Sequence, residues 1–196
     1  MDLTFWLGIV LGLLSSILFW YVTTKILTPK LSVSNSLERS DDREGKPRYR
    51  FTLRNEGHRD AVDVRVKCTL FSHGWARGAS DEIAIVDIPV AVGQIDVMPG
   101  RRWPLFKTAA RPLDILGDRI VSLQLNNVSE FQKGKLTTSD RARLENADMR
   151  LEDLMSLGTG SFLNVVVYGF DRFSGSRNVY SERYYFGNDI VWALTP

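Results

Sequence analysis

The chain has 196 residues, of which 24% are charged and 44% hydrophobic, and its formal net charge at pH 7 is +2. This composition is typical of a folded globular protein and excludes a disordered chain. Because acidic and basic residues are interspersed, it also argues against nucleic acid as a partner, since a nucleic-acid groove needs a clustered basic face.

An uncharged apolar stretch begins the chain. No charged residue lies between Leu3 and Thr24, and a helix of this length spans roughly 33 Å at about 1.5 Å per residue, enough to cross the hydrocarbon core of a bilayer. A signal peptide would have a basic start and a shorter apolar run, and a buried soluble helix of this composition at a chain start is unusual. We therefore predict a transmembrane helix over Leu3–Leu27, with residues 1–28 as a membrane anchor.

The charges beside this helix predict its orientation. Only Asp2 precedes it, whereas lysines and arginines follow it closely, and such residues stay on the cytoplasmic side. We expect the N-terminus outside the cell membrane and the C-terminal domain in the cytoplasm. The alternative is the opposite topology, with the same domain exported. The basic residues are Lys25, Lys30, Arg39, Arg43, Lys46, Arg48 and Arg50.

Small residues recur along one face of the predicted helix. Gly8, Gly12 and Ser16 follow at intervals of four, a spacing that lets two membrane helices approach closely. This stripe predicts self-association or pairing with a partner helix. The alternative is that glycine is simply common in membrane helices.

The remaining residues predict a mainly-β domain. Residues 29–47 read as a juxtamembrane strand at Leu31–Ser34 and a solvated charged loop over Glu38–Lys46. From residue 48 to 196 short alternating segments indicate half-buried strands. In Arg48–Arg54 the inward residues are Tyr49, Phe51 and Leu53. In the next strand they are Val62, Val64, Val66, Cys68 and Leu70, which makes Cys68 a core residue.

The stretch RFTLRNEGHRDAVDVRVKC, followed later by DVMPG at residues 96–100, resembles the immunoglobulin-like and fibronectin-III-like sandwich repeats of adhesion-type proteins. The resemblance covers residues 48–100. It implies an immunoglobulin-like antiparallel β-sandwich and no catalytic residues, because those families share none.

Further segments complete the expected sandwich. Phe162–Tyr168 is almost wholly apolar and predicts a central strand covered on both faces. Ser139–Leu157 instead has helical spacing, with Leu144, Ala147, Leu151, Leu154 and Met155 on one stripe, capped by Ser139. It predicts one inserted amphipathic helix that packs on the sandwich or docks a partner. The other predicted strands are Glu82–Ile88, Gly93–Met98, Trp103–Lys107, Arg119–Leu125 and Val179–Phe186.

The sequence contains no motif that indicates a catalytic, cofactor or metal site. His58 and His73 are the only histidines, and with one core cysteine they cannot form a closed zinc site. The densest basic patch includes Arg101, Arg102 and Lys107, which suit anionic lipid headgroups or lie on solvated strand ends. We expect a non-enzymatic single-pass membrane protein without cofactor, whose domain binds another protein. The alternative is a small-ligand sensor or enzyme with a loop-built site.

Overall fold

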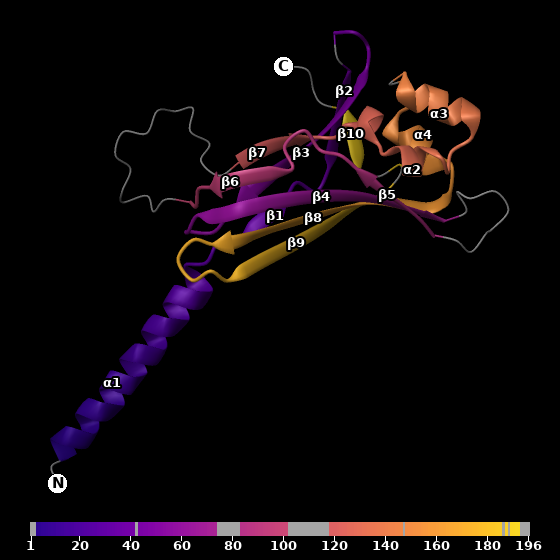
Figure 1. Cartoon of the computed structure of the whole chain (residues 1–196). Coiled ribbons are helices and arrows are strands. Elements are labelled where there is room, and N and C mark those ends of the chain that lie inside the picture. The colour runs from indigo at the N-terminus through magenta and orange to yellow at the C-terminus, as the bar shows by residue number, and fades with distance from the viewer. Residues whose placement is uncertain are drawn as a thin grey trace.

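The computed structural model describes residues 3–41, 43–73, 83–101, 118–146, 148–185, 187 and 189–192. An N-terminal helix projects from one end of a mainly-β domain (Figure 1). This helix, α1 (Leu3–Tyr21), continues into a π-helical segment, η1 (Val22–Ile26). Within η1 the Thr23 and Thr24 hydroxyls donate to the carbonyls of Phe19 and Trp20, at 2.8 and 2.7 Å. Such bonds compete with the helical ladder and suit a widened last turn.

The surface of α1 is apolar and exposed along its length. Residues Thr4–Thr24 have a mean hydropathy of 2.0, and none of this helix is buried against the domain. One helix near the N-terminus is therefore long and apolar enough to span a membrane.

Two five-stranded sheets form the domain. The first, sheet A, has the order β1-β3-β2-β10, with β7 also paired to β3, and its β2–β10 pair is parallel. The second, sheet B, has the order β5-β4-β8-β9, with β6 also paired to β4. The strands of sheet A are β1 (Leu31–Val33), β2 (Leu37–Asp41), β3 (Pro47–Asn55), β7 (Asp118–Ser122) and β10 (Ile190–Trp192). Those of sheet B are β4 (Ala61–His73), β5 (Ile83–Ile88), β6 (Gln94–Met98), β8 (Thr159–Asp171) and β9 (Arg177–Tyr185).

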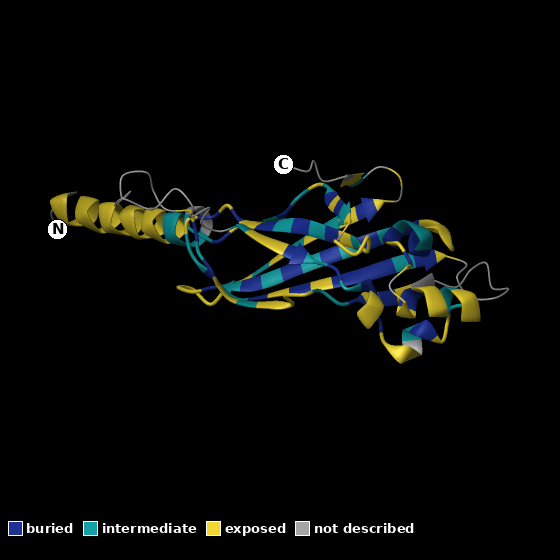
Figure 2. Cartoon of the chain, turned by 90° about the horizontal axis from the view of Figure 1, so that it is seen from above, coloured by how far each residue is buried: buried dark blue, intermediate teal, exposed yellow. Residues whose placement is uncertain are grey.

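The two sheets share one hydrophobic core. Alternate residues of β3 and β8 are buried in it, and Figure 2 shows this alternation along the strands. The predicted inward residues Tyr49, Phe51 and Leu53 are confirmed, each at most 1% exposed. The buried hydrophobic residues of β8 are Leu163, Val165 and Val167.

Strand β8 is not covered on both faces, as its apolar sequence had suggested. Phe162, Val166 and the other alternate residues are only half-buried, because nothing in the described part of the chain packs over the outer face of sheet B. An apolar run therefore marks two different surfaces here, the core and an outer face.

A bulge in β4 shifts the predicted inward series at its start. Asp63 has a φ of 48°, and the pairing with β8 changes register between Val62 and Arg65. As a result Ala61 is buried and Val62 is half-buried, contrary to the expected alternation. Beyond the bulge the prediction holds, and Cys68 lies in the core at 2% exposed.

The single helix predicted over Ser139–Leu157 is wrong. Three short helices lie at the end of the domain opposite α1 (Figure 1): α2 (Glu130–Lys133), α3 (Thr138–Glu145) and α4 (Leu151–Ser156). The cap of α3 is Thr137, whose hydroxyl accepts from the backbone N–H of Asp140 at 3.2 Å, and α3 ends at Glu145. The apolar stripe was correct in composition, since Leu144, Leu151, Leu154 and Met155 are buried, while Ala147 lies outside the described residues.

The solvated loop predicted over Glu38–Lys46 is also wrong, because its first part is strand β2. Arg39 is only 7% exposed, and its Nη1 donates to Glu152 of α4 at 2.9 Å. The hydroxyl of Tyr49 donates to the other oxygen of Glu152 and accepts from the N–H of Leu151 at 2.9 Å. Burial, together with the Glu152 contact, raises the pKa of Tyr49, so the hydroxyl stays protonated. This network fastens α4 to sheet A.

The other strand predictions differ mainly in their ends. β7 is shorter than expected, since Leu125–Asn127 forms a 3-10 turn, η3. β10 was not predicted, and the strand expected at Trp103–Lys107 lies outside the described residues.

Candidate functional site

The amide of Asn55 joins the helix to the domain. Its Oδ1 accepts from the N–H groups of Lys30 and Gly57, both at 3.1 Å. Its Nδ2 donates to the carbonyls of Arg59 and Met98, at 2.9 and 3.1 Å. Asn55 is 4% exposed, and its bonds to Gly57 and Met98 are buried, whereas those to Lys30 and Arg59 are partly buried. This side chain fixes where the segment after α1 enters the domain.

Close backbone packing completes the joint, the contact between residues 28–30 after the helix and the turn that contains Asn55 and Gly57. A Cβ added at Gly57 would lie 2.3 Å from the Thr28 carbonyl oxygen and 2.5 Å from the Cα of Pro29. The N–H of Glu56 also donates to the Lys30 carbonyl at 2.9 Å. Residues 28–30 therefore lie directly against the turn after β3, and the domain is held to α1 by packing as well as by chain connectivity.

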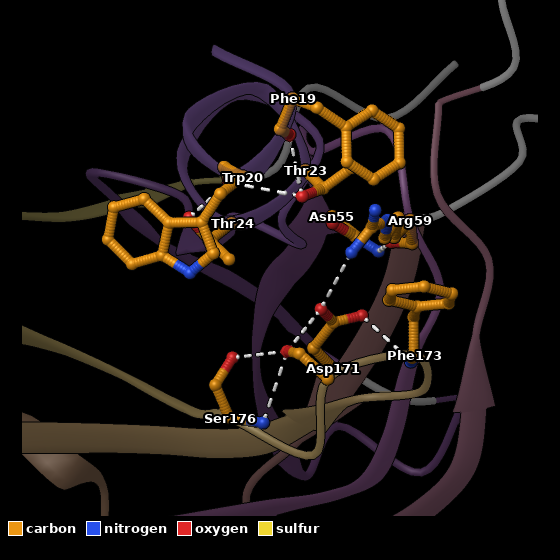
Figure 3. A network of polar contacts seen from close by, with 10 residues as sticks. Phe19, Trp20, Thr23, Thr24, Asn55, Arg59, Asp171, Phe173 and Ser176 are labelled. Atoms are coloured by element: carbon orange, nitrogen blue, oxygen red, sulfur yellow. Dashed lines mark hydrogen bonds and ion pairs between the residues drawn. The ribbon is translucent and has the colours of Figure 1, made fainter. Parts of the chain in front are cut away.

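The β8–β9 hairpin turn lies at the same end of the domain as α1 (Figures 1 and 2). Figure 3 shows its polar network beside the end of the helix. Asp171 accepts from the Phe173 N–H at 3.1 Å, from the Ser174 hydroxyl at 2.6 Å and from Arg59 Nη1 at 3.3 Å. The Arg59 guanidinium lies 4.3 Å from the centre of the Phe173 ring, which is 75% exposed. The turn thus presents an aromatic ring backed by a cation.

These contacts set the protonation state of Asp171. Burial alone would raise the pKa of this carboxyl, but the bonds from Ser174 and the Phe173 N–H, with the Arg59 guanidinium, outweigh it and lower the pKa. Asp171 is therefore ionised at neutral pH and holds both the turn and Arg59 in place.

A second ion pair lines the neighbouring loop. Arg172 Nη1 lies 3.4 Å from Asp60, which also accepts from the N–H of Gly100 at 3.0 Å. The N–H of Arg101 donates to the Gly57 carbonyl at 2.6 Å. Two loops, residues 58–60 and the hairpin turn at residues 171–173, line an open pocket of about 470 Å³. Its lining residues are His58, Arg59, Asp60, Asp171, Arg172 and Phe173.

The structure places one member of the predicted basic patch at this end of the domain. Arg101 is exposed beside Gly57, whereas Arg102 and Lys107 lie outside the described residues. In α1, an added Cβ at Gly8 or Gly12 would meet no atom within 4 Å, and the Ser16 hydroxyl donates to the Gly12 carbonyl at 2.8 Å. Association through this stripe stays a prediction.

The two histidines do not come together. His58 lies in the pocket loop, with Nδ1 3.4 Å from the Arg101 carbonyl, and His73 ends β4 on the exposed surface. Among the described residues, no group of three or more His, Cys, Asp or Glu side chains could hold a metal ion. Burial raises the pKa of the Cys68 thiol, so the thiol stays protonated at neutral pH.

A row of apolar side chains crosses the outer face of sheet B. Phe71 pairs in register with Ile85 on one side and with Phe162 on the other, and Phe162 pairs with Tyr185. The rings of Phe71 and Phe162 stack with centroids 5.1 Å apart, and the Phe162 and Tyr185 rings are 5.7 Å apart. The ends of the row remain open, with Ile85 50% and Tyr185 45% exposed. The row therefore spans four strands on the surface.

Arginines flank this row. The Arg183 guanidinium lies 5.2 Å from the Phe162 ring centre, and Arg177 lies 4.5 Å from that of Tyr168. Two other cations of this face, Arg65 and Lys67, pair with aspartates at 3.1 and 3.4 Å. The face therefore combines half-buried rings and one exposed ring, that of Tyr185, with a surplus of positive charge.

Sequence reasoning did not find Asn55, Arg59 or Phe173. Asn55 and Gly57 were recognised only as a turn, and Phe173 as a hairpin residue. A large aromatic residue in the DRFSGS turn was the available signal, because such turns otherwise favour small polar residues.

No protein-family model matches this chain, and no curated protein compared with it matches significantly.

Proposed function

We propose that this chain is a single-pass membrane protein whose β domain is a non-enzymatic interaction or scaffold module, working within a larger membrane assembly. The observation that carries the proposal is the row formed by Ile85, Phe71, Phe162 and Tyr185 across sheet B. Aromatic and arginine side chains that are partly exposed at a surface are typical of the centre of protein interfaces.

The chemistry of this face indicates its partner. Arg177 and Arg183 favour carboxylates, and the row favours apolar side chains. The partner is therefore a protein surface that presents acidic residues around an apolar centre.

The proposal is tested with the full-length chain purified gently from its native membrane. Phe162→Ala with Arg183→Gln should lower the amount of co-purified or crosslinked protein at least tenfold. Ile120→Ser is the matched control, since Ile120 is 63% exposed but lies on sheet A. Equal recovery of the partner with both variants would contradict the assignment to sheet B.

The membrane topology belongs to the same proposal. The lysines and arginines after the apolar helix support an outside N-terminus and a cytoplasmic domain in the cell membrane. An alkaline phosphatase fused after Pro196 should be inactive, whereas activity there would establish the exported topology instead.

An immunoglobulin-like sandwich is the finer fold that we propose for the domain. Two mostly antiparallel sheets with a common core support it. The second candidate function, a small-ligand sensor or enzyme, is favoured only by the pocket beside Phe173. We rank it second because Arg59 and Arg172, the cations of that pocket, are already engaged with Asp171 and Asp60.

A further inference from the structure

The length of the helical segment sets the depth of the joint in a bilayer. Thr4–Thr24 comprises 21 residues, about 32 Å at 1.5 Å per residue, which matches a hydrocarbon core of about 30 Å. The headgroup layer adds roughly 5–8 Å on each side. Thr28 and Pro29 follow within about 8 Å of helix rise and therefore lie in that layer. Gly57 contacts both residues, so its loop lies at headgroup depth as well.

The loops beside Gly57 carry the chemistry of a lipid contact. The backbone N–H of Arg101 donates to the Gly57 carbonyl, and the Arg59 side chain donates to Asp171 of the hairpin turn. The turn exposes Phe173 and Arg172, whose side chain is 69% exposed. Aromatic rings favour the interface between headgroups and acyl chains, and each arginine near an anionic surface contributes roughly 1 kcal/mol.

The net charge of this end agrees with an anionic surface. Its cations outnumber its carboxylates by two in the described residues 30, 56–60, 99–101 and 171–177. The cations are Lys30, Arg59, Arg101, Arg172 and Arg177, and the carboxylates are Glu56, Asp60 and Asp171.

We propose that the β8–β9 hairpin turn is a second membrane contact, in which Phe173 enters the interface and Arg172 and Arg101 bind the phosphates of anionic phospholipids. This inference rests on α1 spanning the bilayer. It goes beyond the protein-binding role of sheet B, because it concerns how the domain is seated.

The test uses the full-length chain in lipid nanodiscs. Because Cys68 is buried, a polarity-sensitive fluorophore that reacts with thiols labels only the cysteine introduced by Phe173→Cys. The aromatic ring of the fluorophore then takes the place of the phenyl ring. In discs that contain phosphatidylserine, its emission should shift to the blue and be quenched by lipid-borne quenchers. The same label at Ser156→Cys, at the far end of the domain, should report water.

Charge variants separate lipid binding from mere proximity. Arg172→Gln with Arg101→Gln should reduce the quenching in phosphatidylserine discs to the level found in phosphatidylcholine discs. Arg143→Gln, on α3, should leave it unchanged. A water-exposed label at residue 173 in anionic discs would overturn the inference while leaving the anchor intact. Release of the unlabelled chain by alkaline carbonate would overturn the anchor and, with it, the inference.

Discussion

Removing the hydroxyl of Tyr49 tests the network that fastens α4 to sheet A. In Tyr49→Phe the N–H of Leu151 loses its acceptor in a buried position, and Glu152 loses one donor while keeping Arg39. A buried donor without a partner costs about 1–3 kcal/mol, and a hydrogen bond to a charged group contributes about 1.5–3 kcal/mol. Because Arg39 still neutralises Glu152, we expect a loss of about 3 kcal/mol.

Such a loss is large against the stability of a single domain, which is about 5–15 kcal/mol. At about 2–4 °C per kcal/mol for a domain of this size, the melting temperature should fall by about 6–12 °C. Urea unfolding in detergent micelles, followed by circular dichroism, measures the loss in free energy of unfolding. The slope of this free energy against urea concentration should be the same for wild type and variant.

Tyr180→Phe is the control, because it also removes a tyrosine hydroxyl that donates to a glutamate, Glu182, at 2.5 Å. That pair lies two residues apart on β9 and is only partly buried, so water replaces the lost bond and the cost should stay below about 1 kcal/mol. An equal loss in both variants, or an unchanged midpoint for Tyr49→Phe, would refute the assigned role.

Three further predictions follow from the joint, the hairpin turn and the anchor. Asp171→Asn should lower the stability at neutral pH and weaken the dependence of stability on pH in acid. The folded pKa of Asp171 is depressed, so its contribution to stability is present above the unfolded pKa of about 3.9 and is lost as pH falls through the folded pKa. Unfolding midpoints of wild type and variant that stay parallel from pH 6 to pH 2 would count against this prediction. Gly57→Ala forces a Cβ to within 2.3 Å of backbone and should cost about 1–3 kcal/mol in urea unfolding, whereas Gly93→Ala, whose nearest contact would be 3.6 Å away, should be nearly silent; equal midpoints would show that the joint is loose. Gly12→Ile should reduce crosslinked dimer or co-purified helix partner if the small-residue stripe associates, and Leu13→Ile should not; unchanged association in both would leave the glycines without a binding role.

The sequence predicted most of the strands because the side chains of a strand alternate between its two faces every two residues, a pattern visible within a short segment. The alternation of Tyr49, Phe51 and Leu53 depends only on which side of one strand faces the core, and the structure confirmed it. The burial of Arg39 was not predictable in this way. Its charged neighbourhood indicates a loop, and the ion pair with the distant Glu152, which helps to compensate its buried charge, cannot be read from the local sequence.

The contacts of the joint were also not predictable from local sequence patterns. Asn55 has four partners from three parts of the chain, namely Lys30, the loop with Gly57 and Arg59, and Met98, and no periodicity in the sequence connects them. The prediction that Val62 faces the core failed because one residue with a left-handed backbone, Asp63, changes the register of β4, which an alternation pattern cannot anticipate. The candidate site therefore depends on tertiary contacts, whereas the helix and the strands depend on local ones.

The joint at Asn55 also affects the entropy of binding. A domain on a flexible tether samples many tilts, and a partner that binds it must remove that orientational freedom. Here the backbone packing at Gly57 removes it when the domain folds, before any partner arrives. In the proposed arrangement, a partner embedded in the same bilayer would search in two dimensions, at a fixed height, for a face that is already oriented, which would raise the effective concentration of each for the other. A few glycines inserted after Pro29 would therefore weaken association without altering a single interface atom.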